Sequence, residues 1–144
     1  MLLIDKLSGK PVYEQVIEGI EKNILMGIYE PGGVLPSLRE LSVMLGINPN
    51  TIQKSYAELI RRGVIVSSPG SGTYVAPDAI ECIRAMAEEK LLHLADLAAE
   101  LAMAGIPQSD VMAMVSAVYA QAAKERAKAA SAAHTPFQKG GNQS

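Results

Sequence analysis

The chain has 144 residues, of which 49% are hydrophobic and only 4% aromatic, and its formal net charge is -2. This length suits one domain, or a small domain with an extension, and the core has to be built from aliphatic side chains. A charge so close to neutral favours no particular partner. The single cysteine, Cys82, excludes an internal disulfide and a cysteine-rich zinc site, which fits a reducing cytoplasm.

The hydrophobic pattern predicts a chain without membrane segments. Residues 1–10 hold no apolar run of the length that a signal peptide needs, and no segment reaches the roughly 20 apolar residues of a membrane span. We therefore expect cytoplasmic localisation and no membrane partner.

Two helices are predicted in the first third of the chain. Residues 11–27 repeat an aliphatic residue at every fourth position, which is helical spacing. A loop rich in Gly and Pro follows. Ser37 and Glu40 then have the spacing of a capping box, so a short helix begins there and ends at Gly46. The apolar contacts expected from this short helix are Leu38, Leu41, Val43 and Leu45.

A third helix and a hairpin follow. The helix, residues 50–63, begins after the tight connector "INPN", with Asn48 or Asn50 as its cap. Its expected inward face consists of Ile52, Tyr56, Leu59 and Ile60. β-branched and aromatic residues at 64–66 and 73–75 flank the small-residue turn "SSPGSG", which predicts a β-hairpin.

The character of the chain changes at Pro77. Residues 78–104 predict one long helix with a broad apolar face, and a second helix opens at Ser109 with an apolar repeat that reaches Ala122. An alanine-rich stretch can extend that helix on propensity alone. We therefore divide the chain into a folded head (1–76), a helical segment (77–130) and a disordered tail (131–144).

The order helix, helix, tight turn, helix, hairpin is that of a winged helix-turn-helix, whose second paired helix enters the major groove of DNA. The predicted fold class is therefore mainly α with a small β-wing, followed by two further helices. The opening of the third helix agrees, because it carries amides and a hydroxyl and no acid before Glu58. Amides bond base edges, and threonine bonds a base or contacts the thymine methyl. The segment from Val34 to Tyr74 contains four Lys and Arg residues but only two acidic residues, so it has a small excess of positive charge.

The stretch "LPSLRELSVMLGINPNTIQKSYAELIRRGVIVSSPGSGTYV" resembles the winged helix-turn-helix of the GntR family of bacterial transcriptional regulators. The resemblance covers roughly residues 11–76. "NPNTIQKSYAEL" and the short C-terminal part are most similar to the YtrA subfamily, in which two helices follow the DNA-binding domain and make the dimer.

The resemblance implies a function and a set of contacts. The chain would be a sequence-specific regulator, a repressor, that acts as a homodimer on an inverted-repeat operator in double-stranded DNA, with no enzymatic activity and no cofactor. A small-molecule effector, if one exists, would act through the C-terminal helices. The implied DNA-binding residues are Ser37, Arg39, Asn48, Asn50, Thr51, Gln53, Lys54, Gly70, Ser71 and Gly72. Many relatives carry arginine where this chain has Pro49 and Gln53, so their target sites do not transfer.

Other interpretations compete with this one. A winged helix can also serve as a protein-interaction module without DNA binding, and this is the alternative function. Tyr56 is expected to be a core residue, and the helix dipole explains Arg61 and Arg62, which we leave out of the site. Cys82 lacks a resolving cysteine for a redox role.

Four polar residues on the long helix are compatible with a metal site or with a solvated helix face. Glu89, His93, Asp96 and Glu100 share one face of the long helix at ligand-like spacing. A solvated stripe opposite the leucines explains them better. No catalytic grouping or phosphate-binding loop is present in the sequence, so we expect neither an enzyme nor a metal centre.

Overall fold

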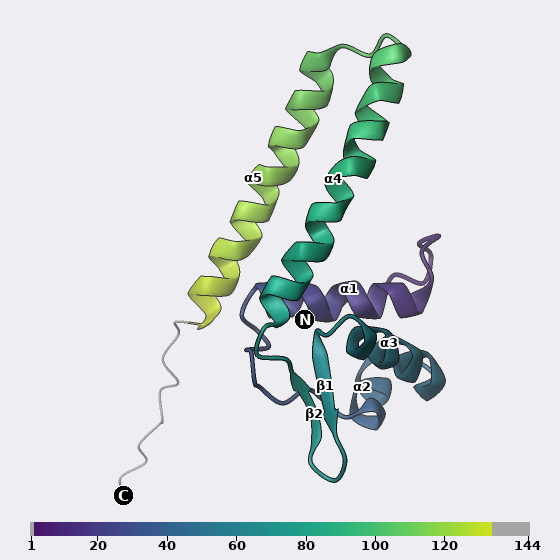
Figure 1. Ribbon diagram of the computed structural model, residues 1–144, viewed down its shortest axis with the longest axis vertical. Coiled ribbons are helices and arrows are strands. Elements are labelled where there is room, and N and C mark those ends of the chain that lie inside the picture. Colours follow the sequence, from purple (N-terminus) through teal and green to yellow (C-terminus); the bar gives the residue numbers. More distant parts are fainter. Residues whose placement is uncertain (1, 134–144) are drawn as a thin grey trace, which may run out of the picture.

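In the computed structural model, which describes residues 2–133, three helices and a hairpin form a head from which two long helices project (Figure 1). The elements in chain order are α1 (Val12–Leu25), α2 (Leu38–Leu45), α3 (Pro49–Arg61), β1 (Ile65–Ser68), β2 (Gly72–Val75), α4 (Ala79–Met103) and α5 (Gln108–Ala133). The predicted fold class, mainly α with a small β-wing, is confirmed. Among these residues, no helix is both long and apolar enough to cross a membrane.

The core of the head lies between α1, α3 and the base of the hairpin. Its buried hydrophobic residues are Val16, Ile17, Ile20, Ile24, Leu35, Leu41, Ile47, Ile52, Tyr56, Leu59, Val64, Ile65, Val75, Ala76, Ala79 and Ile83. Tyr56 is 6% exposed, and its hydroxyl donates a hydrogen bond to the Pro36 carbonyl oxygen at 2.6 Å. The expectation that Tyr56 belongs to the core is therefore confirmed.

Local sequence signals set the limits of α2. The Ser37 amide donates to the Glu40 carboxylate at 2.8 Å, and the Glu40 amide donates to Ser37 Oγ at 3.1 Å, which is the predicted capping box. Gly46 has a φ of 63°, a left-handed conformation that costs glycine little. The chain therefore leaves α2 after eight residues and starts α3 at Pro49.

The wing is an antiparallel pair of short strands. Ile65 lies opposite Val75 and Ser68 opposite Gly72. Val34, from the loop before α2, forms a further bridge with Tyr74. The hairpin is thus fastened at its base, while its tip extends away from α4 and α5 (Figure 1).

Two apolar residues expected in the core lie outside it. Val43 is 78% exposed and Ile60 is 43% exposed. Successive residues on an α-helix are about 100° apart, so Ile60 turns away from the side that buries Leu59. By the same geometry Val43 lies across α2 from Leu41. The apolar character of a residue was therefore not enough to predict whether it lies on the buried or the exposed face of these helices.

The core of the head includes residues on both sides of the predicted domain boundary after residue 76. Ala79 is fully buried and Ile83 is 6% exposed, and both belong to α4. The first turns of the long helix are therefore part of the head. The helical segment also continues to Ala133, three residues past its expected end. The rest of the predicted disordered tail, residues 134–144, lies outside the described residues.

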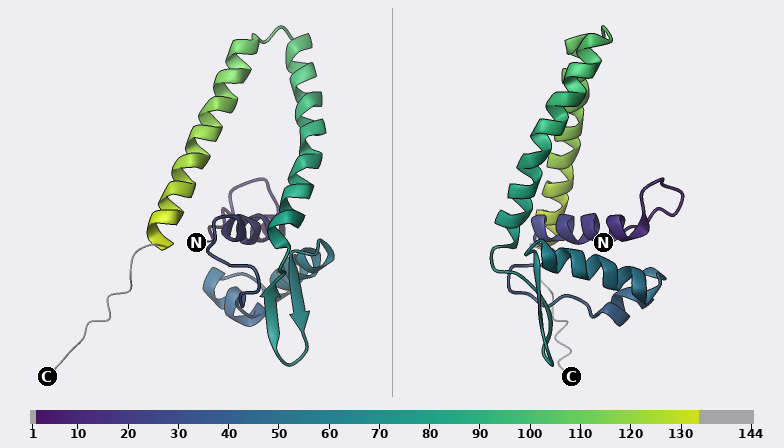
Figure 2. Two further views of the ribbon diagram at one scale, coloured as in Figure 1. Left: turned by 60° about the vertical axis from the view of Figure 1, so that its left-hand side comes forward. Right: turned by 45° about the vertical axis from the view of Figure 1, so that its right-hand side comes forward.

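Beyond Ile83, α4 and α5 expose most of their apolar side chains. The two helices join at a turn in which Gly105 has a φ of 79°, and they then diverge toward the head (Figure 2). α5 meets the head at Glu125, which pairs with Lys22 of α1 at 2.7 Å. The exposed large hydrophobic residues of α4 and α5 include Leu91, Leu92, Leu94, Leu97, Leu101, Met103, Met112, Met114, Val118 and Tyr119.

Neighbouring residues on α3 provide a matched test of this core. Leu59→Ala leaves a cavity in a fully buried site and should lower the free energy of unfolding by about 2–5 kcal/mol. Ile60→Ala, one residue further on and exposed, should change it by less than about 0.5 kcal/mol. Urea denaturation of both variants measures the difference, and equal losses would contradict this placement of the inner face of α3.

Candidate nucleic-acid interface

The start of α3 presents polar side chains to solvent. Asn48 caps the helix, since its side-chain Oδ1 accepts a hydrogen bond from the Asn50 amide at 2.9 Å. Asn50 and Gln53 are exposed and Thr51 is half-buried. The amide groups of Asn50 and Gln53 therefore face solvent from the first two turns, as base-edge recognition requires.

The inner face of α3 holds this surface in place. Ser55 is fully buried, and its hydroxyl donates to the carbonyl oxygens of Tyr13 at 2.9 Å and of Thr51 at 3.1 Å. On the other side, the hydrogen bond from Tyr56 to Pro36 ties α3 to the segment that enters α2. Burial raises the pKa of the Tyr56 hydroxyl, which further favours its protonated form. The two helices of the helix-turn-helix are thereby fixed to each other.

Ser37 and Arg39 lie at the start of α2 and differ in whether their polar groups already have hydrogen-bond or ion-pair partners. The hydroxyl of Ser37 is occupied by the capping box, although the residue remains exposed. Arg39 is exposed, and within residues 2–133 it forms no ion pair. Its guanidinium is available to an anion, and both residues lie near the segment that Tyr56 anchors.

The wing tip is exposed and depends on glycine. Gly70 has a φ of 77° and Gly72 a φ of 124°, and both values lie in the region that L side chains rarely adopt. The Tyr74 hydroxyl donates to the Ser71 carbonyl oxygen at 2.9 Å and so braces the turn. A Cβ at Gly70 would have no neighbour within 4 Å, so backbone conformation, and not space, demands glycine here.

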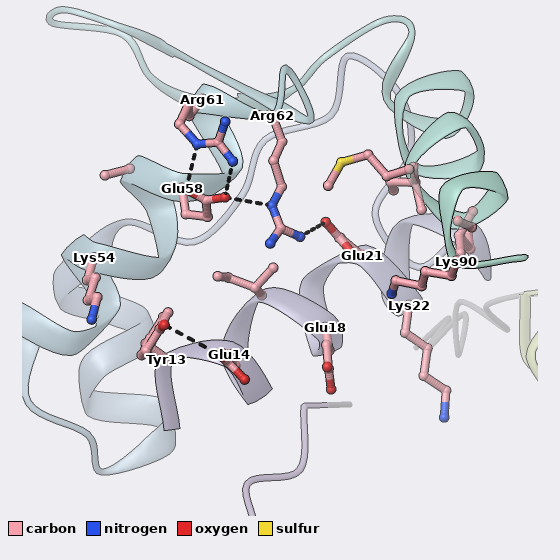
Figure 3. A pocket seen from close by; sticks show the side chains of 16 residues that line it. Tyr13, Glu14, Glu18, Glu21, Lys22, Lys54, Glu58, Arg61, Arg62 and Lys90 are labelled. Atoms are coloured by element: carbon pink, nitrogen blue, oxygen red, sulfur yellow. Dashed lines mark hydrogen bonds and ion pairs between the residues drawn. The ribbon is translucent and has the colours of Figure 1, made fainter. Parts of the chain in front are cut away.

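Lys54 stands apart from the other candidate residues of α3. Its Nζ lies 3.7 Å from the centroid of the Tyr13 ring, on the flank of α3 that faces α1 (Figure 3). The structure therefore groups Asn48, Asn50, Thr51 and Gln53 at the helix opening. It places Lys54 beside them, against α1.

A charged network at the end of α3 was not expected from the sequence. Arg61 contacts the Glu58 carboxylate at 2.6 Å, and Arg62 reaches both Glu58 at 2.9 Å and Glu21 of α1 at 3.0 Å (Figure 3). Hydrogen bonds from Arg61 and then Arg62 lower the pKa of Glu58 to about 2. Glu58 thus stays ionised but balanced by two arginines. The spacing of Glu58 to Arg61 and Arg62, three and four residues, was the available signal.

Residues of α1, α3 and the first half of α4 line a groove of about 900 Å³. Its apolar lining includes Ile17, Ile83 and Met86. Charged residues, among them Glu18, Glu21 and Lys90, also line it (Figure 3). In the described part of the chain, no group of three or more His, Cys, Asp or Glu side chains could hold a metal ion. The stripe that includes His93 is exposed on α4, as a solvated face would be.

The paired helices, the exposed amide-rich turn and the braced wing define a winged helix-turn-helix DNA-binding domain. Residues 12–75 match the family of bacterial regulatory proteins called the gntR family. The chain belongs to this family, because a relative in it is 42% identical and is covered over 75% of its length. Members of this family are transcriptional regulators and not enzymes, as the sequence led us to expect.

Three proteins illustrate the similarity. The HTH-type transcriptional repressor YtrA of Bacillus subtilis is 42% identical over 98 residues, which cover 65% of this chain and 75% of YtrA. A GntR family transcriptional regulator from Listeria monocytogenes has a TM-score of 0.64 and 34% identity, over 78% of this chain and 97% of that one. YtrA from Sulfolobus acidocaldarius, a GntR-family transcription factor, has a TM-score of 0.53 and 33% identity, over 64% of this chain and 97% of that one. The chain is a YtrA-like member of the family.

The wing tip can be tested without disturbing the core. Gly70→Ala and Gly72→Ala should each reduce DNA affinity, because each forces a Cβ into a positive-φ position and reshapes the tip. The unfolding midpoint should fall by only a few degrees, since the tip is exposed. Fluorescence anisotropy with labelled DNA and thermal unfolding measure the two effects. Unchanged affinity in both variants would mean that the tip does not approach DNA.

Proposed function

We propose that this protein is a sequence-specific repressor that binds an inverted-repeat operator as a homodimer. The observation that carries the proposal is the opening of α3, where exposed amides project from a helix that is held rigidly from behind. A groove-reading helix needs this combination, because base edges are distinguished by hydrogen bonds made at fixed positions.

The candidate residues divide into base readers and backbone contacts. Asn50, Thr51 and Gln53 would read base edges in the major groove, and the amide nitrogen of Asn48, whose oxygen caps α3, would assist them. The backbone contacts would come from Ser37, Arg39, Lys54, Gly70, Ser71 and Gly72. Arg39 supports this division best, because it is an exposed cation with no ion pair within residues 2–133.

The exposed apolar side chains of α4 and α5 support the homodimer. Leu94, Leu97 and Leu101 recur along one side of α4 and are between 39% and 57% exposed. A water-soluble chain rarely leaves so extended an apolar surface uncovered. A second copy would cover it in a two-fold arrangement of four helices. Two-fold symmetry in turn matches an inverted repeat, and we expect its half-sites to lie about one helical turn apart.

Repression would be steric. A dimer on a promoter occupies the DNA that polymerase needs, and the similarity to the Bacillus subtilis repressor YtrA supports this direction of control. The protein would act in the cytoplasm, where the chromosome of a bacterium lies. A small-molecule effector would work by changing the spacing of the two heads through α4 and α5.

Two substitutions separate affinity from sequence reading. Arg39→Ala should weaken binding to the preferred DNA by about 1–3 kcal/mol, because it removes a charged contact. Gln53→Ala should relax the preference at one base pair while changing binding to random DNA little, because an amide reads an edge and carries no charge. Selection of binding sites from a random pool, followed by titration in about 150 mM salt, measures both effects.

The alternative function, a protein-interaction module, predicts a different result. The wild-type chain would then select no DNA sequence, and Arg39→Ala would match wild type at every salt concentration. A specific complex whose selection profile is unchanged by Gln53→Ala would leave the proposed function intact and remove Gln53 from the base-reading set.

A pair of matched substitutions on α4 tests the dimer. Leu97→Glu places a charge in the exposed leucine row and should convert the dimer to a monomer at micromolar concentration. Ala99→Glu adds the same charge on the opposite side of α4 and should leave the dimer intact. Loss of the dimer should lower operator affinity by roughly 10²–10⁴, since each head then binds alone. Sedimentation measures the oligomeric state, and titration measures the operator affinity. A monomeric wild-type chain would refute the proposed homodimer.

A further inference from the structure

Lys54 is held in an arrangement that differs from a free surface lysine. Its Nζ lies 3.7 Å from the centroid of the Tyr13 ring, within the range of a cation–π interaction. Tyr13 belongs to the first turn of α1, and Lys54 belongs to the second turn of α3. The contact therefore joins the two helices at the end of the head where α3 begins.

The backbone beneath this contact is fixed. Ser55, the residue after Lys54, is fully buried, and its hydroxyl donates to the Tyr13 carbonyl oxygen at 2.9 Å. The Tyr13 ring and the Lys54 stem thus start from points that a buried hydrogen bond holds together. Tyr13 is half-buried, so its ring has a packed side as well as a face for the ammonium.

The contact orients Lys54 without cancelling its charge. Within residues 2–133, no carboxylate lies at ion-pair distance from Lys54. Glu58, one turn further along α3, is paired with Arg61 and Arg62. Glu14, beside Tyr13, accepts the Tyr13 hydroxyl at 3.3 Å. An aromatic ring attracts a cation without occupying it as a carboxylate would, so the Lys54 ammonium can still contact an external anion.

The direction of Lys54 decides which part of DNA it can reach. A helix in the major groove turns one side to the bases, and its flanks face the phosphates that border the groove. Asn50 and Gln53 are exposed on α3, whereas Lys54 leans over the flank that faces α1 (Figure 3). A lysine on that flank is placed for a phosphate and not for a base edge.

We propose that Tyr13 is a positioning residue for DNA binding: its ring holds the Lys54 ammonium on the α1 flank of α3 to contact a backbone phosphate. The inference rests on the proposed DNA-binding function and adds to it a residue of α1. Tyr13 acts through Lys54, and the benefit is a smaller loss of side-chain freedom when the phosphate is bound.

The test is a double-mutant cycle on the full-length chain, read as salt dependence. The probes are a duplex that the wild-type chain selects from a random pool and a scrambled duplex of equal length. Lys54→Met should reduce the slope of log affinity against log salt by about 1 and weaken binding to both duplexes alike. Tyr13→Leu should weaken binding by about 2–5-fold with Lys54 present and have little effect in the Lys54→Met background.

A conservative variant separates positioning from a direct contact. Tyr13→Phe keeps the ring and removes the hydroxyl, so it should bind DNA like the wild-type chain. If Tyr13→Phe loses as much affinity as Tyr13→Leu, the hydroxyl itself touches DNA or Glu14 matters, and the inference is wrong. Equal effects of Tyr13→Leu in the two backgrounds would also overturn it. Thermal unfolding of each variant shows whether the head remains folded, and Tyr13→Met takes the place of Tyr13→Leu in the cycle if the leucine variant unfolds.

Failure of this inference can be told apart from failure of the proposed function. If the wild-type chain selects no sequence and Arg39→Ala has no effect, the proposed DNA-binding function is refuted, and so is the role of Tyr13. If specific binding holds and depends on Arg39, but Lys54→Met leaves the salt slope unchanged, only the inference falls. A change in preferred sequence on Lys54→Met would make Lys54 a base reader and would likewise overturn it.

Discussion

Burial of the inner face of α3 is the constraint on which the rest of the head depends. Ile52, Ser55 and Leu59 are fully buried, and Tyr56 is nearly so. With aliphatic packing around it, the Ser55 hydroxyl bonds across to α1, and the Tyr56 hydroxyl bonds to the segment before α2. Because both polar groups find partners, their hydrogen bonds offset the cost of desolvation and give the buried face a defined orientation. The outward face of α3 is then fixed as a consequence.

Charge is distributed so that this outward face stays open to an anion. Glu58, the one acid of α3, is held between Arg61 and Arg62, and Arg62 also neutralises Glu21 of α1. Lys54 and Arg39 have no carboxylate partner within residues 2–133. The small net charge of the chain thus conceals a separation between paired charges at the end of α3 and unpaired cations near its start. Such a separation suits a surface that meets phosphates.

The two long helices, α4 and α5, are not stabilised mainly by the core of the head. Their first turns complete the core of the head through Ala79 and Ile83, but their remaining length contributes little to it. A helix with exposed leucines at helical spacing gains stability by burying them against another helix. The head and its long helices are continuous at α4, whose first turns share the core with α1 and α3.

The sequence by itself determined the elements and their order, because capping residues, glycines and aliphatic spacing act over a few positions. The capping box at Ser37, the turn at Gly46 and the hairpin around Gly70 were all predictable from neighbouring residues. Only the tertiary structure decided which of these residues face inward. It exposed Val43 and Ile60, extended the core to Ile83 and placed Lys54 over Tyr13, forty-one residues away. Those outcomes depend on how one helix lies across another, and residues distant in the chain set that geometry together.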